Sequence, residues 1–330
     1  MTNRVPVILD CDPGHDDAIA ILLAAKHLDV LGITTVGGNQ SIEKVTANAL
    51  KVVELGGLAH IPVARGMSRP LIREPRHAAS VHGETGLDGH DFPEPRTPLD
   101  PRGGVAFIVD TVMATDGVTL VPTGPLTNVA TALRLEPRIA ARLAGISLMG
   151  GSAGVGNVTP VAEFNVWVDP EAADVVFRSG VPITMCGLNL THQATAGPAE
   201  IARIRTLDNP AAAAVADLLD FYRGTTGRLS GRNVAYIHDP CAVAAIVDPA
   251  LFEFAEMHVA VELRGQETYG MTVCDARFLG AGERAAELAR AAGAPGPNVR
   301  VAMQIDHARF FDLLCETLAS YGRTGGQTQE

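Results

Sequence analysis

Four carboxylates stand close together near the start of the chain, in the run Asp10-Cys11-Asp12-Pro13-Gly14-His15-Asp16-Asp17. An apolar stretch at 5–9, typical of a buried strand, precedes this run, and an apolar stretch at 18–28, typical of a helix, follows it. Carboxylates packed so closely repel one another and raise each other's pKa unless a cation neutralises them. Oxygen ligands without a nearby pair of Cys or His favour calcium or magnesium over zinc. The spacing therefore predicts a metal site.

Further polar residues follow other predicted strands at the point where each strand ends. Thr123 follows a strand at 118–121, Glu163 and Asn165 come after a strand at 145–149, and the pair His238-Asp239 lies far along the chain. Ligands of open parallel sheets bind outside the carboxyl ends of the strands, so packing alone does not explain this distribution. Asp239 is also placed to N-cap a helix that Pro240 begins, and its role as a cap or as a functional group stays open.

The elements that must position these groups alternate between short β-branched runs and longer helical patterns, which is typical of βαβ units. We expect an α/β fold with an open, mostly parallel but mixed, twisted sheet, helices on both faces, a Rossmann-like arrangement and the active site at the carboxyl ends of the strands. The expected strands are 5–9, 31–36, 61–64, 118–121, 145–149, 181–186, 257–263, 269–273 and 299–303. The expected helices are 18–28, 42–55, 105–114, 126–135, 170–179, 198–223 and 306–321.

Two segments, 66–104 and 152–164, are longer than ordinary connections and are typical of lids or substrate loops. Glycines at 224, 227 and 231 predict a third irregular segment before Tyr236. No internal repeat or linker divides the chain, so we expect a single domain over 1–330 with a loose tail at about 323–330.

The composition excludes several classes of function. Twenty-six basic and thirty-seven acidic residues give a net charge of 26 − 37 = −11, which disfavours nucleic acid and membrane surfaces as partners. The five cysteines are widely spaced and odd in number, so neither a disulfide framework nor a Cys metal site is expected. The first apolar run is too short for a signal peptide, and we expect a cytoplasmic protein.

An aspartyl phosphatase is one alternative, since that pattern also places two Asp residues at a strand end. The position two residues after Asp12 is Gly14, where the phosphatase pattern has Thr or Val. No lysine follows Lys51 to balance a phosphoryl group. Both observations weaken this alternative.

The motifs together resemble the inosine-uridine type nucleoside hydrolases, with matches from residue 5 to about residue 310. The motif at 10–18 is highly specific for that family. The other matches are Val36-Gly37-Gly38-Asn39, His82-Gly83-Glu84-Thr85-Gly86-Leu87, Pro122-Thr123-Gly124, Met149-Gly150-Gly151, Ala162-Glu163-Phe164-Asn165, Thr191-His192-Gln193 and His238-Asp239-Pro240. The resemblance implies an enzyme that hydrolyses the N-glycosidic bond of ribonucleosides to free base and ribose, with broad or inosine/uridine-type specificity and an oxocarbenium-like transition state.

The resemblance also implies the residues that hold a metal and carry the reaction. Asp12, both oxygens of Asp17, the carbonyl of Thr123 and Asp239 would hold a Ca²⁺ ion, whose tolerance for seven or eight oxygens suits that set. Asp12 would also be the general base toward the attacking water. His238 would be the acid for the departing base, because imidazole is easily poised to donate near neutral pH.

By the same resemblance, the ribose contacts would be Asp16, Asn39 and Asn165 at the 2′- and 3′-hydroxyls, Asn157 and Glu163 at the 5′-hydroxyl, and Met149 near the sugar. His82 would reach the base as its loop closes. Tyr222 and Arg228, in the segment that the glycines are expected to break, could line the base pocket.

Departures from the family pattern concern the surroundings of the site. Asn189 stands where the family often has Asp, so a charge near the site is absent. The single tryptophan, Trp167, and Thr226 in place of an aromatic residue argue against stacking of the base by tryptophan. Family analogy implies a small-molecule ribonucleoside as partner and a homodimer or homotetramer. A nucleoside-binding protein without turnover is a second alternative, although Asp12 and His238 are both present.

Overall fold

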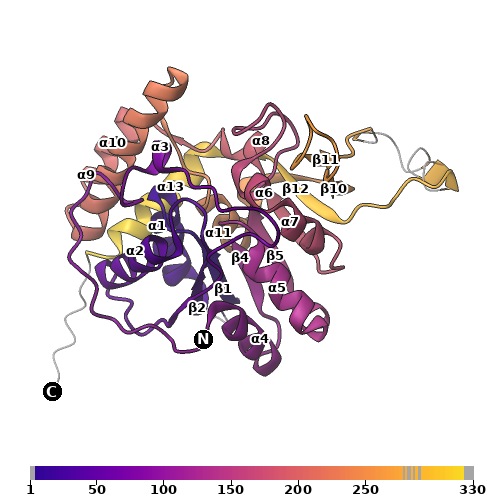
Figure 1. The fold of residues 1–330 in the computed structure, drawn as a ribbon. Helices are drawn as coiled ribbons and strands as arrows, with labels where there is room; N and C mark the ends of the chain where they lie inside the picture. The colour runs from indigo at the N-terminus through magenta and orange to yellow at the C-terminus, as the bar shows by residue number, and fades with distance from the viewer. Residues whose placement is uncertain (1–3, 278, 281–283, 285–286, 289–290, 323–330) are drawn as a thin grey trace.

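A parallel sheet forms the centre of the computed structural model, which describes residues 4–277, 279–280, 284, 287–288 and 291–322 (Figure 1). The strands pair in the order β3-β2-β1-β4-β5-β6-β12-β9, and every pair is parallel except β12 with β9. The strands are β1 (Pro6–Cys11), β2 (Asp29–Thr35), β3 (Val63–Arg65), β4 (Thr119–Pro122), β5 (Gly145–Met149), β6 (Ile183–Cys186), β9 (Phe252–Met257) and β12 (Val299–Ile305). The predicted α/β fold with a mostly parallel sheet is confirmed.

The order of the strands reverses between β1 and β4. From β1 the chain adds β2 and β3 toward one edge, and from β4 it adds β5 and β6 toward the other. A reversal of this kind opens a crevice beyond the carboxyl ends of the two central strands. Asp10 at the end of β1 pairs with Pro122 at the end of β4, so the residues that follow both strands meet in this crevice.

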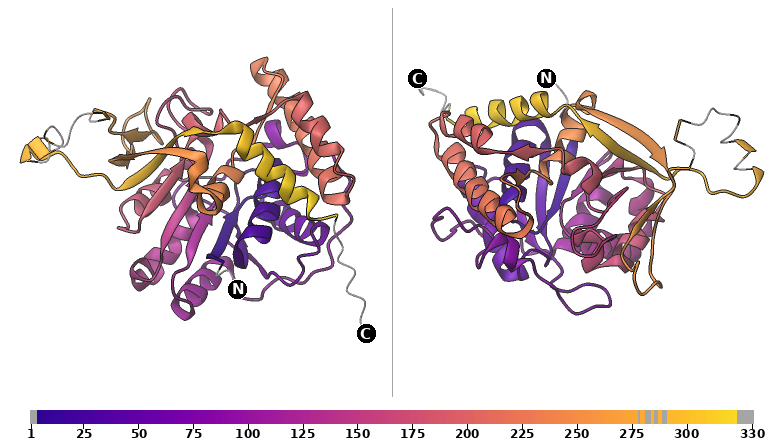
Figure 2. Two further views of the ribbon diagram at one scale, coloured as in Figure 1. Left: turned by 180° about the vertical axis from the view of Figure 1, so that it is seen from behind. Right: turned by 90° about the horizontal axis from the view of Figure 1, so that it is seen from above.

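Helices cover both faces of the sheet, as Figure 1 shows. Side chains of β1 alternate between two cores: Val7 and Leu9 pack with α1, α2, α10, α11 and α13, and Ile8 packs with α4, α5 and α7. In Figure 2, α13 lies beside α1 and α10, so the last helix of the chain packs in the same core as the first. The helices are α1 (His15–His27), α2 (Ile42–Leu55), α3 (Ala79–His82), α4 (Gly104–Ala114), α5 (Thr127–Leu135), α6 (Phe164–Val168), α7 (Pro170–Phe177), α8 (Leu188–Thr191), α9 (Pro198–Arg205), α10 (Pro210–Ser230), α11 (Pro240–Val247) and α13 (His307–Ala319), with 3-10 turns η1 (Pro137–Ala141) and η2 (Pro249–Leu251).

The expected break before Tyr236 is wrong, because α10 continues through Gly224 and Gly227 to Ser230. Only Gly231 ends the helix, with a left-handed φ of 73°. An interior glycine costs about 1 kcal/mol relative to alanine, which contacts elsewhere on a helix can offset. Tyr222, Thr225 and Thr226 are buried along α10 and supply such contacts.

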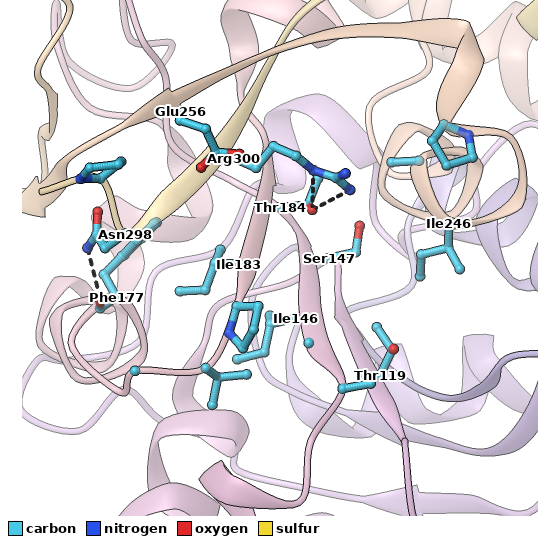
Figure 3. Close-up of a pocket in the computed structure, with 18 of the residues that line it drawn as sticks. Thr119, Ile146, Ser147, Phe177, Ile183, Thr184, Ile246, Glu256, Asn298 and Arg300 are labelled. Carbon is cyan, nitrogen blue, oxygen red and sulfur yellow. Dashed lines mark hydrogen bonds between the residues drawn. The ribbon is translucent and has the colours of Figure 1, made fainter. Parts of the chain in front are cut away.

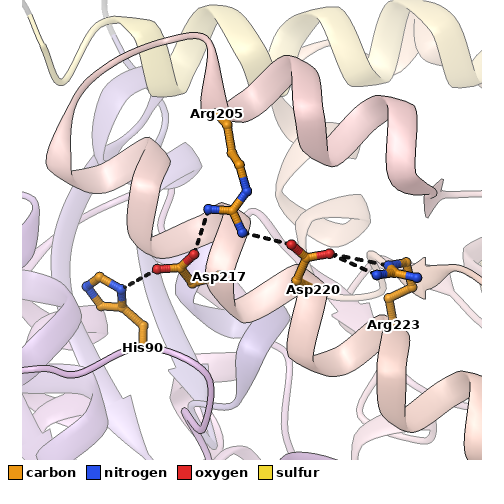
Figure 4. Close-up of polar contacts among 5 residues, drawn as sticks. All are labelled: His90, Arg205, Asp217, Asp220 and Arg223. Atoms are coloured by element: carbon orange, nitrogen blue, oxygen red, sulfur yellow. Dashed lines mark hydrogen bonds and ion pairs between the residues drawn. The ribbon is translucent and has the colours of Figure 1, made fainter.

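A chain of charged groups holds the outer face of α10 (Figure 4). Asp217 accepts hydrogen bonds from His90 Nδ1 at 2.9 Å and from Arg205 at 2.7 Å, and Arg205 also donates to Asp220 at 2.7 Å. Arg223 donates to Asp220 from one turn further along, at 3.1 Å. The network joins α9, α10 and the segment around His90, so the outer face of α10 also favours a continuous helix.

The C-terminal strands also differ from expectation. The stretch predicted as one strand at 257–263 is divided: β9 ends at Met257 in the main sheet, and β10 (Val259–Val261) pairs with β11 (Thr272–Cys274) in a separate antiparallel sheet. Another small sheet joins β7 (Thr195–Ala196) to β8 (Ala235–Tyr236). The apolar residues continue from β9 into β10, so hydrophobicity alone does not indicate that the chain passes from one sheet to another at this point.

The remaining expectations concern loops, cysteines and the chain end. Segments 66–104 and 152–164 are irregular as predicted, apart from α3, an isolated bridge at Ala162 and the first residues of the helices that follow. All five cysteines are free. No helix among the described residues is long and apolar enough to cross a membrane. The predicted loose tail at 323–330 lies outside the described residues.

Replacing Gly32 with alanine tests the packing of β2 on α4. A Cβ at Gly32 would lie 2.1 Å from the Phe107 ring, which is itself fully buried. We expect Gly32→Ala to lower the free energy of unfolding by about 1–3 kcal/mol, because overpacking forces buried groups apart. Chemical denaturation measures this value. Gly296→Ala is the matched control, since its Cβ would meet nothing within 4 Å, and equal stability of both variants would contradict the packing argument.

Candidate active site

A cavity of about 610 Å³ opens where the strand order reverses. Its lining includes residues that follow β1, β2, β4 and β5 and residues of α10. Asp12 and Asp17 are buried beside it, hydrogen-bonded to Asn39 and Thr123. The predicted site residues that line the cavity are Asp16, Asn39, His82, Thr123, Met149, Asn157, Glu163, Asn165, Tyr222, His238 and Asp239.

Four carboxylates gather at one end of this cavity. Asp16, Asp17 and Asp239 each place one carboxylate oxygen so that the three atoms lie within 4.8 Å of one another. Asp12 Oδ2 accepts a hydrogen bond from the backbone N–H of Asn39 at 2.6 Å, while Asp12 Oδ1 is buried without a partner. The structure thus joins Asp239 to the N-terminal acidic run across more than 200 residues of sequence.

Backbone and hydroxyl groups hold the cluster in place. Asp17 accepts from the backbone N–H of Gly14 at 2.9 Å, which caps α1, and from the Thr123 hydroxyl at 2.8 Å. Asp16 Oδ2 accepts from the backbone N–H groups of His238 and Asp239, at 3.0 and 3.3 Å. These acids also lie in the first turn of α1, where the helix dipole favours negative charge.

Asp239 stands at the N-cap position of α11, but its side chain makes no capping hydrogen bond. Its carboxylate instead belongs to the acidic cluster. Of the two roles that the sequence left open, the structure therefore contradicts the cap and favours the functional group.

Burial raises the pKa of each carboxylate in the cluster. The pKa values of Asp12 and Asp239 rise well above the usual range, from burial first and then from the charges of Asp17 and Asp16 respectively. Burial, with the Asp17 charge, raises the pKa of Asp16 to about 7. Without a counter-charge, the four groups cannot all be ionised at neutral pH.

The donor set fits a hard divalent cation. It offers four carboxylates and the carbonyl oxygen of Thr123, which accepts from Asn165 Nδ2 at 2.7 Å and keeps a second lone pair. Oxygen donors of this kind suit Ca²⁺ or Mg²⁺. The cluster can therefore hold a metal ion.

The predicted ribose contacts surround the next part of the cavity. Asn165 Nδ2 also donates to the carbonyl of Met149 at 3.1 Å, and Asn157 Oδ1 accepts from the backbone N–H of Phe164. Both oxygens of Glu163 accept backbone N–H groups at the start of α6. Burial raises the pKa of Glu163 to about 7. The structure brings these residues together, and their roles stay predictions.

His238 also lines the cavity, with its Nδ1 at 2.7 Å from the Thr191 hydroxyl. Burial lowers the pKa of His238 to about 3, with the nearby His192 as a further cause. The ring is therefore neutral at pH 7. A neutral ring can still donate a hydrogen bond, and the role of His238 as the acid for the departing base stays a prediction.

The base side of the cavity is only partly as expected. His82 is 6% exposed and already lines the cavity, at the end of α3. Tyr222 lines it from α10, whereas Arg228 does not appear in the lining and donates to Thr225 on its own helix. The helix turns Arg228 away from the face that carries Tyr222.

Several residues of the lining were missed from the sequence. The additional ones with polar or large side chains are Phe164, His192, Thr226, Leu229, Ser230, Arg232 and Tyr236. Positions 222, 226, 229 and 230 recur at helical spacing, so the signal existed. The expected break at the glycines concealed it.

A larger cavity, of about 1090 Å³, lies at the opposite ends of the strands (Figure 3). Residues at the start of β5 and β6 line it, with Arg300 donating to Thr184 at 3.0 Å. Among the described residues, Glu256 is the only acidic one in its lining, and it is exposed. Its groups cannot hold a divalent cation as the acidic cluster can, so the smaller cavity is the better candidate site.

Comparison with known proteins gives consistent matches over the chain. Residues 7–312 match the family model described as inosine-uridine preferring nucleoside hydrolase. The pyrimidine-specific ribonucleoside hydrolase RihA of Shewanella woodyi is 47% identical over 325 residues, covering 96% of this chain and 99% of the relative. RihA of Photobacterium profundum is 45% identical over 324 residues, with 96% and 99% covered. The structure of a purine-preferring ribonucleoside hydrolase from Gardnerella vaginalis superposes with a TM-score of 0.87 at 32% identity, covering 97% of this chain and all of that one.

In the metal-free protein, the buried carboxyl groups should contribute less to stability as the pH rises. Burial raises the pKa of Asp10 to about 6 and of Asp16 to about 7, whereas an unfolded Asp titrates near about 4. These groups hold protons in the folded chain that the unfolded chain has released, so their contribution to the free energy of unfolding falls between about pH 4 and pH 7. Buried histidines with a lowered pKa, such as His238, contribute in the opposite direction. Calcium should reverse the trend of the carboxyl groups by binding the ionised cluster, with about 3 kcal/mol gained at a hundredfold excess over Kd.

Thermal unfolding at pH 5 and pH 7, with chelator or with calcium, measures both effects. Asp239→Asn should abolish the calcium response and, without calcium, should unfold at a higher temperature than the wild type at pH 7, because one buried repulsive charge is gone. Asp29→Asn, at an exposed position, should behave as wild type. A full calcium response in Asp239→Asn would contradict the assignment of the cluster.

Proposed function

The chain belongs to the inosine-uridine preferring nucleoside hydrolase family and is an N-glycosyl hydrolase of ribonucleosides, and from this premise we propose that it is a calcium-dependent enzyme acting on pyrimidine ribonucleosides. The observation that carries the proposal is the buried cluster of four carboxylates beside a cavity that also contains His238. The base preference follows the RihA relatives, which are more similar to this chain than the purine-preferring structure.

Asp12, Asp17, Asp239 and the carbonyl of Thr123 are the residues that would hold the cation. When bound, Ca²⁺ would neutralise these carboxylates, orient the ribose hydroxyls and lower the pKa of water in the site. The larger coordination number of Ca²⁺ would suit this set of carboxylates and a carbonyl better than the octahedral preference of Mg²⁺.

Asp12 is the proposed general base. One oxygen is held by Asn39 N–H, and the other is buried without a partner, so it is free to take the proton of the attacking water. The backbone contact fixes the orientation of the carboxylate before substrate binds. Geometry of this kind lowers the entropic cost of the attack.

Asp16, Asn39 and Asn165 are proposed to bind the 2′- and 3′-hydroxyls, with Asn157 and Glu163 at the 5′-hydroxyl. The transition state of glycoside hydrolysis carries positive charge on the sugar ring. Carboxylates fixed around the ring stabilise that charge as it develops. Met149 then supplies an apolar contact to the sugar.

His238 is proposed to assist the departing base as a neutral imidazole. We infer that the Thr191 hydroxyl, 2.7 Å from Nδ1, donates to this nitrogen, which leaves the proton of the neutral ring on Nε2. That N–H can donate to a base atom that gains negative charge as the glycosidic bond breaks. Because the pKa of His238 is lowered to about 3, we propose that a neutral imidazole carries the expected role of acid toward the departing base.

Reducing-sugar release from uridine, cytidine, inosine, adenosine and guanosine tests the reaction and the base preference together. We expect release mainly from uridine and cytidine, abolished by a strong calcium chelator and restored by calcium. Asp12→Asn should lower kcat by at least about 100-fold, as the loss of a general base does. Asp29→Asn is the control and should keep wild-type activity. The proposal fails if calcium-loaded wild type releases ribose from none of the five nucleosides.

The importance of the 2′-hydroxyl is a separate expectation. If Asp16 and the cation both hold this group, a 2′-deoxy substrate leaves their buried polar atoms unpaired. We expect kcat/KM for 2′-deoxyuridine to be at least about a hundredfold below that for uridine. Comparable values for the two substrates, measured by base release, would remove the 2′-hydroxyl from the proposed contacts.

A further inference from the structure

Two buried histidines, from segments far apart in the sequence, face each other beside the cavity. His15 begins α1 and His82 ends α3, and their Nδ1 atoms lie 3.0 Å apart. The second nitrogen of His15, Nε2, lies 2.8 Å from the backbone carbonyl oxygen of Asp88. Together they form a chain from a backbone carbonyl through His15 to His82.

The direction of hydrogen bonding along this chain follows from the carbonyl at its end. A carbonyl oxygen can only accept, so His15 Nε2 carries a hydrogen. In a neutral ring, Nδ1 of His15 is then the acceptor, and His82 Nδ1 must donate to it. A neutral His82 that donates through Nδ1 has a lone pair, and no hydrogen, on Nε2.

Both rings are neutral in this environment. His15 is fully buried and His82 is 6% exposed, so a positive charge on either ring would be removed from water. Neither ring is hydrogen-bonded to a carboxylate among the residues that the structure describes. The arrangement requires no change of protonation, only one tautomer of each ring.

The carbonyl that sets the direction is held firmly. The Asp88 carboxylate accepts from the backbone N–H groups of Glu84 and Thr85, each at 2.9 Å, which closes the turn. Two residues later, His90 contacts Asp217 of α10 in the charged network of Figure 4. Ring stacking with Phe221, at 5.2 Å between centroids, holds His15 against the same helix.

The second ring nitrogen of His82, Nε2, lies on the side of the ring that is not bonded to His15, and the residue lines the cavity. His82 lines it together with Tyr222 and His238, and its Nε2 has no hydrogen-bond partner among the described residues. His82 makes no hydrogen bond to the carboxylate cluster, which would take the ribose. Its neighbours Tyr222 and His238 are on the side where the base would lie.

We propose that His15 is a positioning residue that fixes His82 as a hydrogen-bond acceptor toward the base, so that the site selects bases presenting an N–H there. This inference rests on the proposed function and deepens it. The ring N–H of uracil and the amino group of cytosine are donors of the required kind. A base methylated at the ring nitrogen, as in 3-methyluridine, lacks the donor.

Nitrogen-15 NMR of the calcium-loaded wild type tests the tautomer without any substitution. Histidine-labelled protein at pH 7 should show His82 protonated on Nδ1 only, with the resonance assigned by its loss in His82→Asn. A ring protonated on Nε2, or on both nitrogens, would overturn the proposal. This readout does not depend on catalysis, so it separates failure of the inference from failure of the proposed function.

His15→Phe tests the effect on specificity while it keeps a ring in the stack. Wild type should prefer uridine to 3-methyluridine by about tenfold or more in kcat/KM, as expected for one hydrogen bond to a buried group. In His15→Phe, the ratio of kcat/KM for uridine to that for 3-methyluridine should fall toward one. His82 should then populate both neutral tautomers.

Phe221→Leu is the matched control, because it removes a stacking partner of His15 but leaves the hydrogen bonds from the Asp88 carbonyl through His15 to His82. The Nδ1-protonated tautomer of His82 and the preference for uridine over 3-methyluridine should both be retained. A calcium-dependent rise in Tm checks that each variant is folded. An unchanged ratio in folded His15→Phe, or no preference for uridine in the wild type, would refute the proposed contact to the base. The wild-type measurements decide the matter even if His15→Phe does not fold.

Discussion

Repulsion among four buried carboxylates is the constraint on which the rest of this structure depends. Asp12, Asp16, Asp17 and Asp239 lie together with 0–4% of their surface exposed, where each ionised group raises the pKa of the others. Only a parallel sheet with a reversal in strand order brings together the ends of two central strands and the start of a helix. Backbone N–H groups, the dipole of α1 and a cation are the means by which such a cluster is stabilised.

The two sides of the cavity are built from different kinds of structure. The side assigned to ribose and metal consists of residues that directly follow sheet strands, such as Asp12 and Thr123. The side assigned to the base consists of α10, α3 and the segment around Tyr236. The ends of central strands are fixed by hydrogen bonds to a neighbouring strand on each side. Loops tolerate more sequence change than the elements that they connect, so the base side of the cavity can vary more. If the proposed assignment holds, base preference can change on the helical side while the sheet-end side stays the same.

Much of this could be predicted from the sequence, and the failures have physical causes. The acidic run was informative because strand, turn and helix follow one another within a few residues. Asp239 was ambiguous because a helix N-cap and a metal ligand require the same residue type. The glycines of α10 misled because local propensity favours a break, while buried contacts of Tyr222 and Thr226 favour a helix. The pairing of His15 with His82 joins residues 67 positions apart, which no local pattern reports.

Two glycines beside Asp12 limit what this site can become. A Cβ at Gly38 would lie 2.1 Å from Asp12 Oδ2, and one at Gly124 would lie 2.7 Å from Oδ1. The carboxylate thus fills a space with walls on both sides, and a Glu, one methylene longer, has no room there. A side chain added at Gly38 or Gly124 would therefore displace the Asp12 carboxylate. Substitutions on α10 can reshape the cavity without moving this carboxylate, so a change of base preference is easier to reach there than beside Asp12.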